Sequence, residues 1–200
     1  MRDWWLRTLL VLSRPRPVFV ALRDDDPDAA GDRAEPVFLI IWLAGIAAIL
    51  ADATTYLDDG TRDGVDLALW AFTAGGITGV FGYFVVGWIL YRVVRALGSQ
   101  GSYRRARHVL AFAAIPIVLS LVLWPFKLAL DGDDWFRSGG RDSGAELVAF
   151  DALSFGLYAW SIALLVIGVR SVHGWTWQRA LVASAATLVL PVGLSVLLAL

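Results

Sequence analysis

Five long apolar runs, separated by short polar segments, dominate this 200-residue sequence and restrict the folds that it can adopt. Each run is near the roughly 20 residues that a helix needs to cross about 30 Å of hydrocarbon. A helix satisfies its own backbone hydrogen bonds in lipid, and the runs are too long for barrel strands. The sequence therefore predicts an all-α integral membrane protein, a five-helix bundle. We expect its spans at about 37–52, 66–91, 109–130, 147–169 and 180–200, and the first could extend to Leu57.

The composition agrees with a membrane location and excludes several kinds of site. Apolar residues make up 58% of the chain and charged residues 18%, whereas a soluble domain of this length needs more polar surface. The chain has no cysteine, which excludes disulfides, thiolate metal sites and cysteine nucleophiles. It also lacks a Ser-His-Asp set, a phosphate-binding glycine loop and an HExxH motif. We expect no enzymatic activity, no cofactor and no nucleic-acid partner.

Residues 1–22 are predicted to form an amphipathic helix and an Arg-Pro segment. Trp4 and Trp5 lie with several leucines on a broad apolar face, and Arg7 lies opposite. Because this segment is too short to cross a bilayer, we expect it to lie in the membrane interface with its indole rings at headgroup level. The alternative is a cytosolic helix packed on the end of the bundle. Pro15 and Pro17 are expected to end the helix.

Residues 23–35 read RDDDPDAAGDRAE, a polar and acidic stretch broken by Pro27 and Gly31. Such a composition offers little apolar surface to bury, so we expect an acidic flexible linker. Pro36 then suits the first turn of a helix, where its missing N–H costs nothing. Residues 36–200 are predicted to form the five-span transmembrane domain.

The distribution of basic residues predicts the orientation of the bundle. Thirteen of the 17 basic residues fall on one side of the predicted spans, namely Arg2, Arg7, Arg14, Arg16, Arg23, Arg33, Arg92, Arg95, Arg104, Arg105, Arg107, Arg170 and Arg179. The other side has Arg62, Lys127, Arg137 and Arg141, and its loops are rich in aspartate. The positive-inside rule predicts a multi-pass protein of the cell membrane with a cytoplasmic N-terminus and an external C-terminus. Lys127 is the only lysine, a bias typical of bacterial genes with high GC content.

A basic cluster of Arg104, Arg105, Arg107 and His108 precedes the third run. It could bind anionic lipid headgroups, dock an acidic protein, or simply hold its loop in the cytoplasm. His108 and His173 are both expected in cytoplasmic loops. Neither has further ligands at metal spacing, so we expect no metal site.

Two ionisable residues are predicted near the external ends of their spans. Asp151 lies about one turn into the fourth run, and Lys127 lies at a similar depth in the third. The two could pair, or Asp151 could lie at headgroup level, where the helix dipole favours it. Together with the prolines inside the runs, they suggest a small transporter or lipid-handling protein as an alternative function.

Glycines in the second run are spaced for close helix packing. Gly75, Gly79 and Gly82 would form a groove into which another helix backbone could fit. That helix could belong to the same bundle or to a second copy of the chain in a homo-oligomer.

The stretch around the second and third runs resembles the Yip-one domain family, membrane proteins named for interaction with Ypt/Rab GTPases. The resemblance lies in Leu97-Gly98, then Gly101-Ser102-Tyr103, then the apolar start of a helix leading to Ile115-Pro116, and it extends to the five-span layout. It implies structural roles for Gly98, Gly101, Tyr103 and Pro116. It also implies a five-helix bundle with a cytoplasmic N-terminus and no enzymatic activity. We do not extend the GTPase partner of eukaryotic relatives to this chain, which we expect to be bacterial.

These observations favour a non-enzymatic membrane protein that organises membrane or protein partners at its cytoplasmic face. The expected contacts are the bilayer, anionic lipids in particular, and a membrane-protein partner or a second copy. The predicted contact residues are Trp4, Trp5, Arg7, Arg104, Arg105, Arg107 and His108.

Overall fold

The computed structural model describes residues 2–58, 60, 63–132 and 145–198. The described chain is helical throughout and contains no strand, which confirms the all-α prediction. The elements are α1 (Arg2–Ser13), α2 (Pro15–Ala21), α3 (Pro27–Asp32), α4 (Ala34–Ala51), α5 (Ala53–Asp58), α6 (Gly64–Trp70), the π-helical turn η1 (Ala71–Gly75), α7 (Gly76–Ala96), α8 (Tyr103–Ala113), α9 (Ile115–Leu119), the 3-10 turn η2 (Ser120–Val122), α10 (Leu123–Asp131), α11 (Ala145–His173) and α12 (Trp177–Leu198).

Four helical stretches among the described residues are long and apolar enough to cross a membrane. They cover Ala34–Ala51, Gly64–Ala96, Tyr103–Leu130 and Val148–His173, and they correspond to the first four predicted spans. The fold is an all-α membrane helical bundle. The fifth predicted span coincides with α12, and its last two residues lie outside the described residues. The first span ends at Ala51, because Asp52 separates α4 from the short helix α5.

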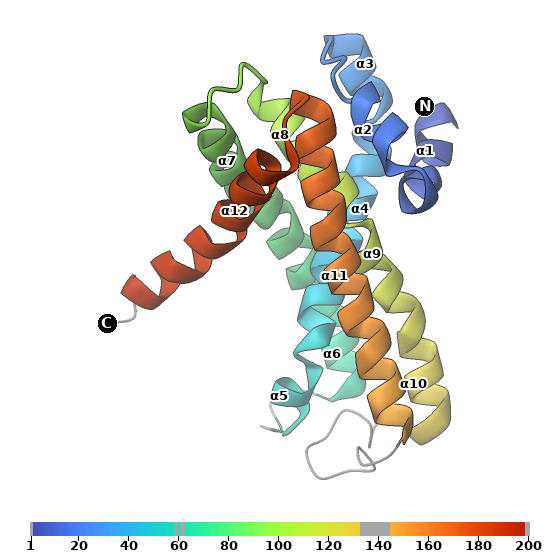
Figure 1. The fold of residues 1–200 in the computed structure, drawn as a ribbon. Coiled ribbons are helices and arrows are strands. Elements are labelled where there is room, and N and C mark those ends of the chain that lie inside the picture. Colours follow the sequence, from blue (N-terminus) through green and yellow to red (C-terminus); the bar gives the residue numbers. More distant parts are fainter. Residues whose placement is uncertain (1, 59, 61–62, 133–144, 199–200) are drawn as a thin grey trace.

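The spans run side by side, and α12 diverges from them toward the C-terminus (Figure 1). Helix α7 packs on α4 and α8, α11 packs on α8 and α9, and α12 contacts α7 and α11. Helices α1–α3, the loop at residues 97–102 and the turn at residues 174–176 gather at one end of the bundle, which we call the arginine-rich end. The end of α10 and the start of α11 lie at the opposite end. Arg62, Arg137 and Arg141, which were predicted on that side, lie outside the described residues.

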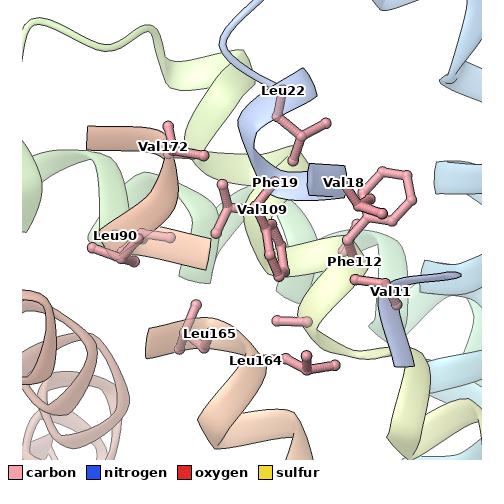
Figure 2. Packing of buried hydrophobic residues seen from close by; sticks show 14 of the residues in the cluster. Val11, Val18, Phe19, Leu22, Leu90, Val109, Phe112, Leu164, Leu165 and Val172 are labelled. Carbon is pink, nitrogen blue, oxygen red and sulfur yellow. The ribbon is translucent and has the colours of Figure 1, made fainter. Parts of the chain in front are cut away.

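Helix α2 is part of the core of the bundle. Val18, Phe19 and Leu22 are buried and pack with Val109 and Phe112 of α8 and with residues of α11 (Figure 2). Gly168 on α11 makes room for this contact, because a Cβ atom there would lie 2.8 Å from the Phe19 ring. The sequence reasoning assigned this stretch only an Arg-Pro connection.

Helix α1 packs on the bundle along one face, and its position in the membrane interface stays a prediction. Trp4 and Val11 are buried against the bundle, and the Trp4 ring lies 5.6 Å from that of Phe112. The other face exposes large apolar side chains, those of Trp5, Leu6, Leu9 and Leu10. A helix at the end of a membrane bundle keeps such a face only where lipid or a partner meets it.

Residues 23–35, which were predicted to be a flexible linker, are the region where prediction and structure differ most. Asp26 caps α3 by accepting a hydrogen bond from the Asp28 N–H at 3.1 Å, and Pro27 occupies its first turn. Arg33, immediately after α3, is completely buried. Composition alone underestimates the order of this stretch because its polar groups find partners in the bundle. The division of the chain at residues 22 and 35 stays a prediction.

The glycine groove of the second span packs against α4. A Cβ atom on Gly79 would overlap the Ile41 carbonyl, and one on Gly75 would lie 2.9 Å from the Gly45 carbonyl oxygen. Gly45 in turn faces both glycines, so the two backbones touch directly. Gly82 has no atom within 4 Å of its Cβ position and takes no part in this contact.

The third span is interrupted near Pro116. Helix α8 ends at Ala113, and buried Pro116 lies in the first turn of α9. Proline cannot donate to the preceding turn. The Ser161 hydroxyl of α11 donates to the Ala113 carbonyl at 2.7 Å and so joins α11 to the interruption.

Candidate functional site

Arg33 is the centre of a buried polar network at the arginine-rich end. Its Nε donates to Nδ1 of His108 at 2.7 Å, and its Nη1 donates to the Asp24 carbonyl at 2.8 Å. Its Nη2 pairs with the Asp25 carboxylate at 3.2 Å. Burial lowers the pKa of the Arg33 guanidinium, and the charges of Asp25 and Asp24 act in the opposite direction. Because a guanidinium can only donate, His108 accepts at an unprotonated Nδ1.

Three further contacts connect the N-terminal segment to the bundle. The Ser102 hydroxyl donates to the Asp25 carboxylate and accepts from the Arg105 N–H at 3.0 Å, so it also caps α8. The Arg105 guanidinium donates to the Arg23 carbonyl at 2.6 Å. Arg23 itself donates to the Ser171 carbonyl near the end of α11 at 2.6 Å. Residues 23–33 are thereby held to both α8 and α11.

Arg107 lies in a cage of aromatic rings. Its guanidinium carbon is 4.5 Å from the ring centroids of Phe84 and Tyr103 and 5.1 Å from that of Tyr83. The Tyr103 hydroxyl fixes one wall by donating to the Phe84 carbonyl at 2.7 Å. Gly87 leaves the space through which the Arg107 side chain passes. The buried Nε of Arg107 has no hydrogen-bond partner within the described residues.

A groove of about 540 Å³ opens beside this cage, between α3, α4, α7 and α8. Its apolar lining includes Val37, Phe38, Ile41, Val80 and Phe84, and its polar lining includes Arg104, Arg107 and His108. Among the described residues, no acidic side chain lines it. The groove can therefore accept a molecule with an apolar body and an anionic group.

The basic cluster is on a helix rather than in a loop. Helix α8 begins at Tyr103, six residues before the predicted span, so Arg104, Arg105 and Arg107 are held on its first two turns. His108 was expected in a loop and is instead buried within α8, and His173 is the last residue of α11. The helix was predicted to begin too late because the three arginines lower the local hydropathy. Ser102 nevertheless supplies a cap at its true start. Within the described residues, no group of three or more His, Asp or Glu side chains could hold a metal ion.

The chain matches a protein-family model over most of its length. The model of the Yip1 domain matches residues 9–200, which include α2, the network and the bundle. The chain belongs to the Yip1 domain family. No curated protein and no solved structure matches the chain.

The glycines that carry the resemblance to the Yip1 domain shape the loop between α7 and α8. Gly98 has a φ of +86°, and the Ser99 and Gly98 N–H groups bond to the carbonyls of Val94 and Arg95, both at 2.9 Å. This pattern is a Schellman cap, which favours glycine because of its left-handed backbone. Gly101 lets His173 approach, since a Cβ atom there would lie 3.1 Å from the imidazole. The Ser99 hydroxyl bonds Nδ1 of His173 at 3.0 Å.

The two ionisable residues predicted at the opposite end of the Yip1 domain lie on adjacent helices. Lys127 is on α10, with its ammonium 5.7 Å from the centroid of the Phe150 ring. Asp151, on α11, is exposed and close enough to interact electrostatically with Lys127. The structure thus brings these two residues together, far from the Arg33 network (Figure 1).

Sequence reasoning missed Arg33, Asp25 and Ser102 as members of one site. Ser102 stands three residues before Arg105, at the spacing of a helix cap, and this signal was visible. The pairing of Asp25 with Arg33 was not visible in the sequence, because an acidic run next to an arginine is usually solvated.

Proposed function

We propose that this Yip1 domain protein is a non-enzymatic membrane protein that organises membrane or protein partners through its arginine-rich end. That end faces the cytoplasm of a bacterial cell, and the C-terminus lies outside the plasma membrane. The placement is supported by thirteen basic residues, which lie on or beside α1–α3 and at the adjoining ends of α7, α8, α11 and α12.

The observation that carries this proposal is a rigid basic surface beside an exposed apolar one. Arg104 and Arg107 both line the groove at this end, and Arg107 lies over aromatic rings. Helix α1 at the same end exposes Trp5, Leu6 and Leu9. Basic residues near an anionic membrane each contribute roughly 1 kcal/mol of attraction, and exposed apolar side chains add to it.

The test is recruitment of anionic vesicles to the full-length protein held in nanodiscs of neutral lipid. Flotation measures the fraction of vesicles that contain phosphatidylglycerol and bind to the discs. Changing Arg104, Arg105 and Arg107 together to Gln should reduce this fraction several-fold. Because Arg105 also supports residues 23–33, the double variant Arg104→Gln/Arg107→Gln separates contact from folding. Lys127→Gln, at the opposite end, is the control for the loss of one positive charge away from the basic cluster.

Unchanged recruitment by the double variant, with its topology preserved, would contradict a lipid contact. Co-purification with the same variants then tests a protein partner, including a second copy of the chain. If the variants retain both vesicles and partners, the proposed function is wrong.

An apolar groove favours a second candidate, a small transporter or lipid-handling protein. It has a volume of about 450 Å³ and lies between α11 and the stretch from the end of α9 to the start of α10. Its lining includes Leu123, Leu153 and Ala152, the residue after Asp151. A proteoliposome flux assay compares the wild type with Asp151→Asn. Flux that depends on Asp151 would support this candidate, and flux indifferent to the substitution would remove it.

A further inference from the structure

The groove beside Arg107 has two chemically different halves. Toward α4 and α7 it is lined by Ile41, Val80 and the half-exposed ring of Phe84. Toward the start of α8 it is bordered by Arg104 and Arg107. An apolar trough with a cationic rim matches an amphiphile that has an anionic head.

The aromatic cage prepares Arg107 to bind an anion. Rings that stack on a guanidinium occupy its faces and leave the N–H groups in its plane free to donate. The cage also restricts a side chain that would otherwise lose rotamer freedom on binding. Its Nε has no acceptor among the described residues, so one donor is buried and unsatisfied.

The other charged groups near the rim are already engaged. Arg33 is buried on the far side of His108, and Asp25 is bonded to both Arg33 and Ser102. His108 accepts from Arg33, which leaves it uncharged. The groove therefore presents two cations with no lining carboxylate to neutralise them.

We propose that this groove binds one anionic phospholipid, with its phosphate on Arg104 and Arg107 and an acyl chain along Ile41, Val80 and Phe84. The inference rests on the proposed function and names the ligand of its basic surface. A lipid fits better than a peptide because α4 and α7 belong to spans with exposed apolar side chains, and the exposed Phe38 of α4 lines the groove. Lipid chains surround such faces, and basic pockets between spans at the cytoplasmic side select anionic headgroups.

The test is native mass spectrometry of the full-length protein in detergent, with phosphatidylglycerol or phosphatidylcholine added at equal concentrations. The wild type should retain one phosphatidylglycerol in preference to phosphatidylcholine. Arg107→Gln should weaken phosphatidylglycerol binding roughly fivefold to tenfold and leave phosphatidylcholine binding unchanged. Arg92→Gln is the matched control, because it removes one charge from α7 at the same end but outside the groove, near Trp88.

A second variant tests the acyl half without altering a charge. Val80→Phe adds volume to the trough and should also weaken phosphatidylglycerol binding, while sn-glycerol 3-phosphate alone should not compete. Retention of both lipids to the same extent would overturn the proposal. Equal loss in Arg92→Gln, or full competition by glycerol phosphate, would also overturn it. If the groove does not bind the lipid, the proposed function can still be correct, because vesicle recruitment in nanodiscs does not require a lipid in the groove.

Discussion

The two ends of the bundle are stabilised in different ways. At the arginine-rich end, the buried Arg33 guanidinium joins residues of the N-terminal segment to His108, 75 residues along the chain. At the opposite end, the small buried cluster consists of Ala53, Leu57 and Leu67, with Trp124 and Phe150 packed on it. One end therefore depends on specific polar partners from distant segments. The other depends on apolar contact, with Lys127 and Asp151 near its surface.

The largest difference between the ends should appear when Arg33 is replaced. Arg33→Met approximately keeps the length of the side chain, but it removes the donor to His108 and leaves the Asp25 carboxylate with only the Ser102 hydroxyl as a donor. Breaking a buried ion pair by removing one partner costs about 3 to 5 kcal/mol. We expect a loss of that size in the free energy of unfolding, measured by SDS titration in mixed micelles. Residues 14–33 should also become sensitive to protease.

Arg14→Met is the control for this substitution, because Arg14 is exposed and its side chain makes no cap contact. It should change the unfolding free energy by less than about 0.5 kcal/mol. Equal effects of the two substitutions would show that the network does not hold the N-terminal segment.

The apolar contacts of α2 should rank next. Phe19 is fully buried between α8 and α11. Replacing a core Phe by Ala lowers the free energy of unfolding by about 3 to 5 kcal/mol, and the loss is smaller where neighbouring groups can fill the cavity. Because α2 is a short helix that can shift toward α11, we expect Phe19→Ala to cost about 3 kcal/mol in the same titration. Leu57→Ala at the opposite end should cost less, since its cluster is small. A larger loss for Leu57→Ala would reverse the comparison.

The same contrast explains what could be predicted from the sequence. Four spans were recognised because a helix that crosses a bilayer needs a continuous run of apolar residues of nearly fixed length, which is visible in the local sequence. The Gly98 turn was also recognised through the family resemblance, since its left-handed backbone restricts the residue type. Both are properties of neighbouring residues.

Several of the missed features depend on partners distant in the sequence. Residues 23–35 have the composition of a solvated linker, and nothing local indicates that Arg33 will reach His108. Phe19 follows two prolines, and its burial depends on Gly168. His108 looked like one more member of a basic cluster, although its helical position turns it inward. A single sequence records the chemistry of such groups but not their pairing.

The loop between α7 and α8 offers a test of intermediate size. In Gly101→Ala the new methyl group would lie 3.1 Å from the His173 ring and 3.2 Å from the Ser99 hydroxyl, both tighter than ordinary contact. Overpacking of this kind costs about 1 to 3 kcal/mol. Gly156→Ala, in α11 with nothing within 4 Å, should instead stabilise by up to about 1 kcal/mol through helix propensity. If both variants were neutral, the contact of Gly101 with His173 would be looser than the structure indicates.

The smallest effect is expected for Lys127→Met at the opposite end. Its interaction with Asp151 is partly exposed, and exposed ion pairs contribute about 0 to 1 kcal/mol. The methionine would keep the contact with the Phe150 ring through its sulfur, which compensates part of the lost cation–π attraction. We therefore expect a change below about 1 kcal/mol in the same SDS titration. A loss as large as that of Arg33→Met would show that Lys127 and Asp151 form a buried, specific pair, and both ends would then depend on paired charges.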